Sequence, residues 1–343
     1  MDKQYYSLFK PYKVRKANFF IVLLLLFATL SCEKGSGGQN SNLPDSTGSI
    51  NSIAVIVDDI LWKGAVGDSL RTKLANTVQG LPDEEPSITL NQYAPKLFSD
   101  AVKSNRNIVV VSLGNEAEFK HVENEFAAPQ NVYYFTGPNV QSILELLEVH
   151  GETLESSIKF YELIEMQKIN AKQLLNDIKI QKRFGVNLQI PDAYDYVITK
   201  SSFYWLKKEI PTGNLSLLLY TVPKSAIENQ QDVVSNVIRI RDSIGALYIQ
   251  GIHPKSKMIT EESYYPYLAE VHFEKGKAFE IRGTWELTND YMNGPFVNYA
   301  FKDLKNDNYL IVEGFVYNPT HMKRDYMFEL EAIIKTIHFN SEK

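Results

Sequence analysis

The sequence predicts an α+β protein: a mixed α/β unit comes first, and an antiparallel sheet with helices on one face follows. Between residues 51 and 185, short continuous apolar runs alternate with helical segments, which is typical of a buried, partly parallel sheet. Between residues 186 and 340 strand-like segments dominate. The composition, 44% hydrophobic and 22% charged over 343 residues, excludes collagen-like and largely disordered chains.

In the first unit, residues 53–57 form an apolar run without alternation, so we expect a strand covered on both faces. Residues 107–113 and 132–135 predict two further buried strands, and a helix follows the first strand. Apolar residues at helical spacing then predict helix over about 139–183, interrupted near Gly151. Gly185 is expected to end this helical stretch.

In the second unit we expect seven strands and two helices. The strands are predicted at 194–200, 203–208, 215–222, 268–274, 279–287, 296–301 and 309–317. The helices are predicted at about 226–244 and 321–337. On the last helix, Glu331 and Lys335 are spaced to form a favourable exposed ion pair.

One hairpin, between strands 268–274 and 279–287, allows a prediction of register. We expect the apolar residues of both strands to share one face, which requires a loop of odd length. Gly276 would supply a positive φ in that loop. This register places His272 near Arg282 on the outer face.

The N-terminus has the pattern of a secretory signal. Five basic residues precede residue 19, and an apolar run extends over 19–30. Twelve residues of helix reach about 18 Å, against about 30 Å of hydrocarbon, so the run is too short to span a bilayer. Residues 1–31 are therefore predicted to be a signal peptide.

The run ends at Leu30-Ser31-Cys32, and Cys32 is the chain's only cysteine. This segment resembles the lipobox of bacterial lipoproteins, although the leucine stands two residues before the cysteine rather than three. The resemblance implies that Cys32 carries lipid such as palmitate and anchors the protein in the cell envelope, with the outer membrane as the expected location. A plain signal peptide with an incidental cysteine is the alternative.

Four segments are therefore expected: a signal peptide (1–31), a lipidated cysteine with a flexible tether (32–50), an α/β subdomain with a helical hairpin (51–185) and an antiparallel α+β subdomain (186–340). Removing residues 1–31 leaves 31 basic and 40 acidic side chains, a formal charge of −9. An acidic domain without a basic cluster is not expected to bind nucleic acid. Lipid, rather than charge, would then hold it at the membrane.

The sequence contains none of the common catalytic signatures for hydrolases, nucleotide binding or zinc peptidases. No cofactor and no metal are expected. The pattern Glu270-x-His272-x-Glu274 offers three metal-ligand types on one strand face, but an exposed face of mixed charge explains it equally well.

Several polar residues in apolar surroundings are candidates for a binding site. Asp58 follows the first strand, where carboxylates often act in α/β folds. Arg241 and Asp242 lie on a predicted helix, and Arg282 and Trp285 lie within a predicted strand. A structural salt bridge is the simpler interpretation of the arginines, and recognition of an anionic or sugar ligand is the alternative.

Motifs at 62–71, 80–82, 241–243, 282–286, 294–296, 313–317 and 323–324 resemble, in this order, a Bacteroidota envelope lipoprotein family, the domain of unknown function 4837. The resemblance adds Trp62 to the candidate binding residues and implies no catalytic residue. We expect a binding or accessory module of the envelope, with a membrane anchor and an envelope protein partner. An envelope hydrolase acting on glycan or peptide, through carboxylates such as Asp58 or Asp242, and a small-ligand carrier remain alternatives, so whether the protein is an enzyme stays open.

Overall fold

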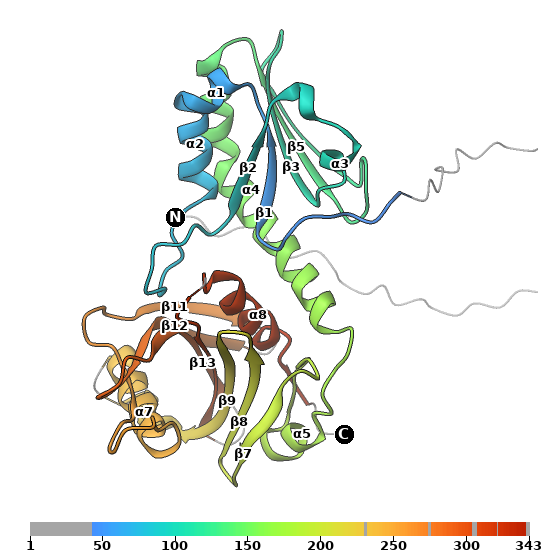
Figure 1. Ribbon diagram of the computed structural model, residues 1–343. Coiled ribbons are helices and arrows are strands. Elements are labelled where there is room, and N and C mark those ends of the chain that lie inside the picture. Colours follow the sequence, from blue (N-terminus) through green and yellow to red (C-terminus); the bar gives the residue numbers. More distant parts are fainter. Residues whose placement is uncertain (1–42, 230–231, 274–275, 304–306, 321, 341–343) are drawn as a thin grey trace, which may run out of the picture. The chain divides into compact units, whose positions relative to one another are not determined.

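The computed structural model describes residues 43–229, 232–273, 276–303, 307–320 and 322–340, and confirms the α+β class (Figure 1). The predicted signal peptide, Cys32 and part of the predicted tether lie outside these residues. Among the described helices, none is both long and apolar enough to cross a membrane.

The first half of the described chain holds a five-stranded sheet and its helices. Its elements are β1 (Ser52–Ile56), α1 (Asp59–Lys63), α2 (Ala65–Leu74), β2 (Thr89–Tyr93), a 3₁₀ turn (Pro95–Leu97), α3 (Asp100–Lys103), β3 (Asn107–Leu113), β4 (Glu118–Glu123), β5 (Asn131–Gly137) and α4 (Val140–Asn170). The strand order is β2-β1-β3-β5-β4, with β4 antiparallel and the other pairs parallel. The expected partly parallel sheet is thus present.

Strand β1 is covered on both faces, as its unbroken apolar run predicts. Ile53 and Val55 belong to the core cluster that includes residues of α2 and α4, whereas Ala54 and Ile56 belong to a separate cluster. Alternate residues of a strand point to opposite faces, so each face of β1 has its own core.

The long helix α4 runs through Gly151, so the predicted interruption there is wrong. Gly151 is buried, and a Cβ atom at this position would lie 2.9 Å from Cδ of Lys73 on α2. The glycine therefore permits close helix packing rather than a break. The helical stretch is interrupted after Asn170 instead, and α5 (Ile178–Phe184) ends at Gly185, which has a φ of +69°.

The second half is built around an eight-stranded antiparallel sheet. Its elements are β6 (Val186–Asn187), β7 (Asp195–Thr199), β8 (Phe203–Ile210), β9 (Gly213–Pro223), α6 (Lys224–Ile227), α7 (Val233–Tyr248), β10 (Met258–Thr260), β11 (Tyr267–Phe273), β12 (Gly276–Leu287), β13 (Asn293–Asp303), β14 (Asn308–Tyr317), α8 (Arg324–Ile334) and β15 (His338–Phe339). The order is β10-β12-β13-β14-β9-β8-β7, and β11 also pairs with β12. All seven strands expected here are found.

Both faces of this sheet are buried, which differs from the prediction of helices on one face. Leu217 and Leu219 of β9 pack in the core that includes Leu330 of α8. Their neighbours Leu218 and Tyr220 pack in a second core that includes residues of α7. Helix α8 therefore covers one face and α7 packs against the other.

The predicted register of the β11–β12 hairpin is wrong. Tyr267, not His272, lies opposite Arg282, and His272 lies opposite Lys277. Pairing ends at Phe273 and Gly276, so the connection has two residues, 274 and 275, which lie outside the described residues. Gly276 has a φ of +148°, in the region that favours glycine.

Candidate functional site

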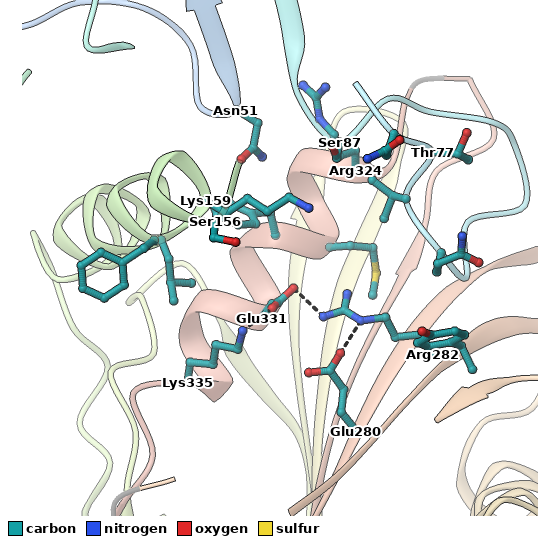
Figure 2. A pocket seen from close by; sticks show the side chains of 18 residues that line it. Asn51, Thr77, Ser87, Ser156, Lys159, Glu280, Arg282, Arg324, Glu331 and Lys335 are labelled. Atoms are coloured by element: carbon teal, nitrogen blue, oxygen red, sulfur yellow. Dashed lines mark hydrogen bonds and ion pairs between the residues drawn. The ribbon is translucent and has the colours of Figure 1, made fainter. Parts of the chain in front are cut away.

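A cleft of about 510 Å³ is lined by parts of the chain that are distant in sequence (Figure 2). They are the segment 76–79 after α2, the middle of α4, the start of β11 with the adjoining part of β12, and one side of α8, together with Asn51 before β1 and Ser87 before β2. This volume falls within the range of about 300–1,000 Å³ typical of small-molecule sites.

Arg282 on β12 is the central polar group of the cleft. Its Nε donates to Oε1 of Glu280 at 2.6 Å, and its Nη2 lies 2.8 Å from Oε2 of Glu331 on α8. Figure 2 shows the guanidinium between the two carboxylates. Burial alone would lower the pKa of Arg282, but the two carboxylates raise it, so the side chain is firmly charged.

Glu331 links the arginine to a second cation. Oε1 of Glu331 lies 2.6 Å from Nζ of Lys335, and the Glu331 side chain is only 13% exposed. Burial would raise the pKa of Glu331, but Arg282 and Lys335 overcome this effect and hold the pKa at about 2. The predicted Glu331–Lys335 pair is present, but it is a largely buried part of a network rather than an exposed pair.

Tyr299 on β13 lies directly opposite Glu280 and is the last member of the network. Its hydroxyl donates to Oε2 of Glu280 at 2.6 Å. Burial, and then the charges of Glu331 and Glu280, raise the pKa of Tyr299 well above its usual value, so the phenol stays protonated. Both carboxylates of the cleft are thus paired with cations or donors.

One part of the remaining wall is apolar, and amide, hydroxyl and basic side chains form the rest. Phe160 and Leu163 of α4, Met327 and Phe328 of α8, and Tyr267 of β11 line the cleft, with Phe160 58% exposed and Tyr267 57% exposed. Lys159 also lines it and bonds Glu155 on the same helix at 2.7 Å. An apolar wall beside a fixed, neutralised polar cluster is suited to a ligand with an apolar body and a few polar atoms.

The N-terminal end of α8 is fixed at the cleft by the first half of the chain. The carboxylate of Glu85 accepts hydrogen bonds from the backbone N–H groups of Lys323 and Arg324, at 2.8–3.0 Å. Arg324 in turn donates through Nη1 to the carbonyl of Pro86 at 2.8 Å. These contacts satisfy backbone donors at the start of the helix and hold Arg324 in the cleft wall.

The segment after α2 contacts β12 directly. Gly80 has a φ of +80°, and a Cβ atom there would lie 2.9 Å from Cβ of Arg282 and 3.0 Å from the backbone nitrogen of Gly283. Only glycine allows both this backbone conformation and this approach.

Of the six candidate binding residues, only Arg282 lines this cleft. Arg241 is 1% exposed, and its Nε donates to Oε1 of the fully buried Glu313 at 2.9 Å. Asp242 accepts hydrogen bonds from the backbone nitrogen and the hydroxyl of Thr260, at 2.7 and 2.8 Å. Asp242 also lines a shallower depression formed by α7 and β10.

The other three candidates lie elsewhere. Trp285 is 2% exposed, and its Nε1 donates to the carbonyl of Val316 at 3.2 Å. Trp62 lies at the junction of α1 and α2, beneath the guanidinium of Arg71 at 4.6 Å. Asp58 is exposed and directly precedes α1. The six residues therefore do not converge on one cleft.

Sequence reasoning did not identify Glu280, Phe160 or the role of Glu331. The spacing of Glu280 and Arg282 was a usable signal, because residues i and i+2 of a strand share a face. The described residues contain no group of three His, Cys, Asp or Glu side chains arranged to bind a metal. Glu274, the third member of the alternative metal pattern, lies outside the described residues.

Two family matches cover most of the described chain. Residues 172–336 match "Domain of unknown function (DUF4837)", and residues 46–171 match "Domain of unknown function (DUF8532)". The two matches together cover residues 46–336, and both families are described only as domains of unknown function. The motifs between residues 62 and 324 predicted a resemblance to the first family in both halves of the chain, but the match is confined to residues 172–336.

The chain was also compared with curated proteins and solved structures. No curated protein matches it. The Ran-binding protein Mog1p of Saccharomyces cerevisiae is 9% identical, with a TM-score of 0.30, and the match covers 45% of this chain and 90% of that one. Human StAR-related lipid transfer protein 5 is 10% identical, with a TM-score of 0.23, over 51% of this chain and 97% of that one.

Proposed function

We propose that this protein is a lipid-anchored cell-envelope protein that acts by binding, and that the cleft around Arg282 is its ligand site. The ligand site is supported by one observation: an apolar wall lies beside a fixed charged network in a cleft of about 510 Å³. The lipid anchor is supported by the N-terminal pattern that ends at Cys32.

Binding accounts for the cleft better than hydrolysis does. A general acid or base needs a carboxyl group that is free to exchange its proton near the operating pH. Glu331 has a pKa of about 2, and Glu280 is bonded to both Arg282 and Tyr299. These carboxylates are arranged to orient the arginine, so we assign them a positioning role.

The ligand we propose is small and amphipathic. Its apolar part would lie against Phe160, Leu163 and Phe328, which removes apolar surface from water at about 25 cal/mol per Å². Its polar atoms would meet Arg282 and Lys335, whose charges are already balanced by carboxylates. A strongly anionic ligand would have to displace those carboxylates, so a neutral or weakly polar head group fits best.

A matched pair of variants on α4 tests the binding site. Phe160→Asp places a charge in the cleft wall, whereas Val149→Asp places the same charge on an exposed residue of the same helix outside the cleft. The full chain is purified in mild detergent. Binding of the neutral fluorescent probe Nile red, corrected for a detergent blank, is measured by fluorescence titration, and co-purifying small molecules are detected by native mass spectrometry.

Phe160→Asp should lose most of the binding, and Val149→Asp should keep it. Equal binding by both variants would place the ligand elsewhere and refute the cleft. The anchor is tested separately by metabolic labelling with an alkyne palmitate, where the wild type should be labelled and Cys32→Ala should not. An unlabelled wild-type chain would refute the lipid anchor.

A further inference from the structure

The seven-residue strand β11 forms an unprotected edge of the large sheet. Its register with β12 is continuous from Tyr267 to Phe273, without a bulge, and β12 is its only strand partner among the described residues (Figure 1). In an antiparallel pair, every second residue of an edge strand directs its N–H and C=O away from the partner. Within the described parts of the chain, about half of the backbone groups of β11 therefore have no strand partner and can pair with another strand.

The opposite edge of the same sheet lacks these properties. Strand β7 has five residues, and its register with β8 shifts between Tyr196 and Ile198. Such irregularities are a common protection against unwanted strand pairing. Strand β11 contains no proline and no lysine, the residues that usually block an edge.

The start of β11 and the segment just before it also expose an unusual amount of apolar surface. Tyr264 and Tyr265 are 64% and 73% exposed, and Tyr267 and Leu268 are 57% and 40% exposed. Four large side chains in one short stretch are typical of a surface that a partner covers.

The charges near this edge indicate the nature of the partner. Glu270 lies on β11, Glu262 lies in the segment leading to it, and Asp232 accepts a hydrogen bond from the hydroxyl of Tyr265. The ammonium of Lys277 bonds Glu270, which leaves a net charge of −2 for these four groups. A basic segment would complement them.

A second copy of this chain fits the edge poorly. The antiparallel register that pairs all seven residues of β11 with those of another β11 places Glu270 opposite Glu270. Like charges directly opposite each other destabilise a strand pair.

We infer that β11 is a docking site for an extended, basic segment of a partner protein, which adds a strand to the sheet. Backbone hydrogen bonds would supply affinity, and alternate side chains of the added strand would supply specificity. On one face those side chains would lie next to Tyr267, which lines the cleft. The inference does not require that the cleft binds a small ligand or that Cys32 is acylated.

Model peptides test this inference on the full chain in detergent. The probe is a fluorescently labelled seven-residue peptide of alternating lysine and valine, and its controls are the glutamate–valine peptide and a lysine–valine peptide N-methylated at alternate residues. Binding is measured by fluorescence anisotropy, and hydrogen exchange with mass spectrometry locates it. Glu270→Lys is compared with Glu118→Lys, which makes the same charge change at an exposed position on β4.

The lysine–valine peptide should bind saturably and protect the amides of residues 267–273. N-methylation should abolish binding, and Glu270→Lys should weaken it about fivefold, as expected for one exposed charge pair, while Glu118→Lys leaves it unchanged. Each of the following would overturn the inference: no saturable binding, equal binding of the N-methylated peptide, equal effects of the two variants, or protection at β7. Self-association of the chain through β11 would identify a second copy as the occupant and would also overturn it.

Discussion

Removing the Arg241 guanidinium should strongly destabilise the fold, because it leaves Glu313 buried without its cation. Arg241 Nε lies 2.9 Å from Glu313 Oε1, its Nη1 donates to Thr260 at 3.0 Å, and its guanidinium carbon lies 3.9 Å from the ring centre of Phe296. At an effective dielectric constant of about 20, the charge interaction alone is about 6 kcal/mol before desolvation. Measured losses for breaking such pairs are about 3–5 kcal/mol, so we expect about 4 kcal/mol for Arg241→Met.

The pH dependence identifies the cause of this loss. Burial raises the pKa of Glu313, and the neighbouring Arg241 partly opposes the effect. A carboxyl group whose folded pKa is raised contributes stability below its unfolded pKa, and this contribution is lost as the pH rises through the folded value. Without Arg241 the folded pKa rises further, so the loss in Arg241→Met should be largest at about pH 8 and smaller at about pH 5.

Urea unfolding followed by circular dichroism measures the free energy of unfolding for the wild type, Arg241→Met and the double variant Arg241→Met/Glu313→Gln. The double variant should recover part of the loss, since it removes the unpaired charge. A loss below about 1 kcal/mol in the single variant, or one that does not depend on pH, would refute the reasoning.

Three further predictions concern Glu331 in the cleft, the start of α8, and the packing of α2 against Trp62. Glu331→Gln should lower the free energy of unfolding by up to about 3 kcal/mol near neutral pH, because the pKa of Glu331 is lowered from 4.5 to about 2 in the folded protein. In the wild type this stabilisation is lost as the pH falls from 4.5 to about 2. The acid-unfolding transition should therefore be less steep in the variant. Glu85→Ala removes the acceptor at the start of α8 and should cost about 1–2 kcal/mol in urea unfolding, whereas Glu84→Ala should have little effect. Gly67→Ala places a Cβ 1.8 Å from the carbonyl oxygen of Trp62, so its melting temperature should fall clearly, and a melting temperature equal to that of the wild type would contradict this contact.

Apolar patterning predicted the interior strands well because interior strands carry long apolar runs. Strands β9, β13 and β14 and the last helix were all found close to their expected positions. Strands β2 and β4 were missed. Strand β4 reads Glu-Phe-Lys-His-Val-Glu and lies at a sheet edge, where no apolar run is required.

The register error in the β11–β12 hairpin has a definite physical cause. The prediction assumed that charged residues of β12 face solvent, but Glu280 and Arg282 point to the face covered by α8 and neutralise each other there. When both faces of a sheet are buried, alternation of polar and apolar residues no longer indicates which face is inside. The composition of the cleft was unpredictable for a different reason, since Glu331 and Phe160 come to the same cleft as Arg282 only through long-range packing.

Three of the motifs that suggested the resemblance to the domain of unknown function 4837 are explained structurally by these contacts. Gly80 packs on Arg282 and Gly283, and the backbone of Lys323 and Arg324 bonds Glu85. Three motifs that are separate in the sequence thus meet where residues 46–171 contact residues 172–336, the two segments that match separate domains of unknown function. A residue that packs or bonds between the two segments tolerates few substitutions, even when it contacts no ligand. Arg282 and Arg324 also line the cleft. A change in how the two segments pack would therefore change the walls of the cleft, and a ligand bound there would be coupled to this interface.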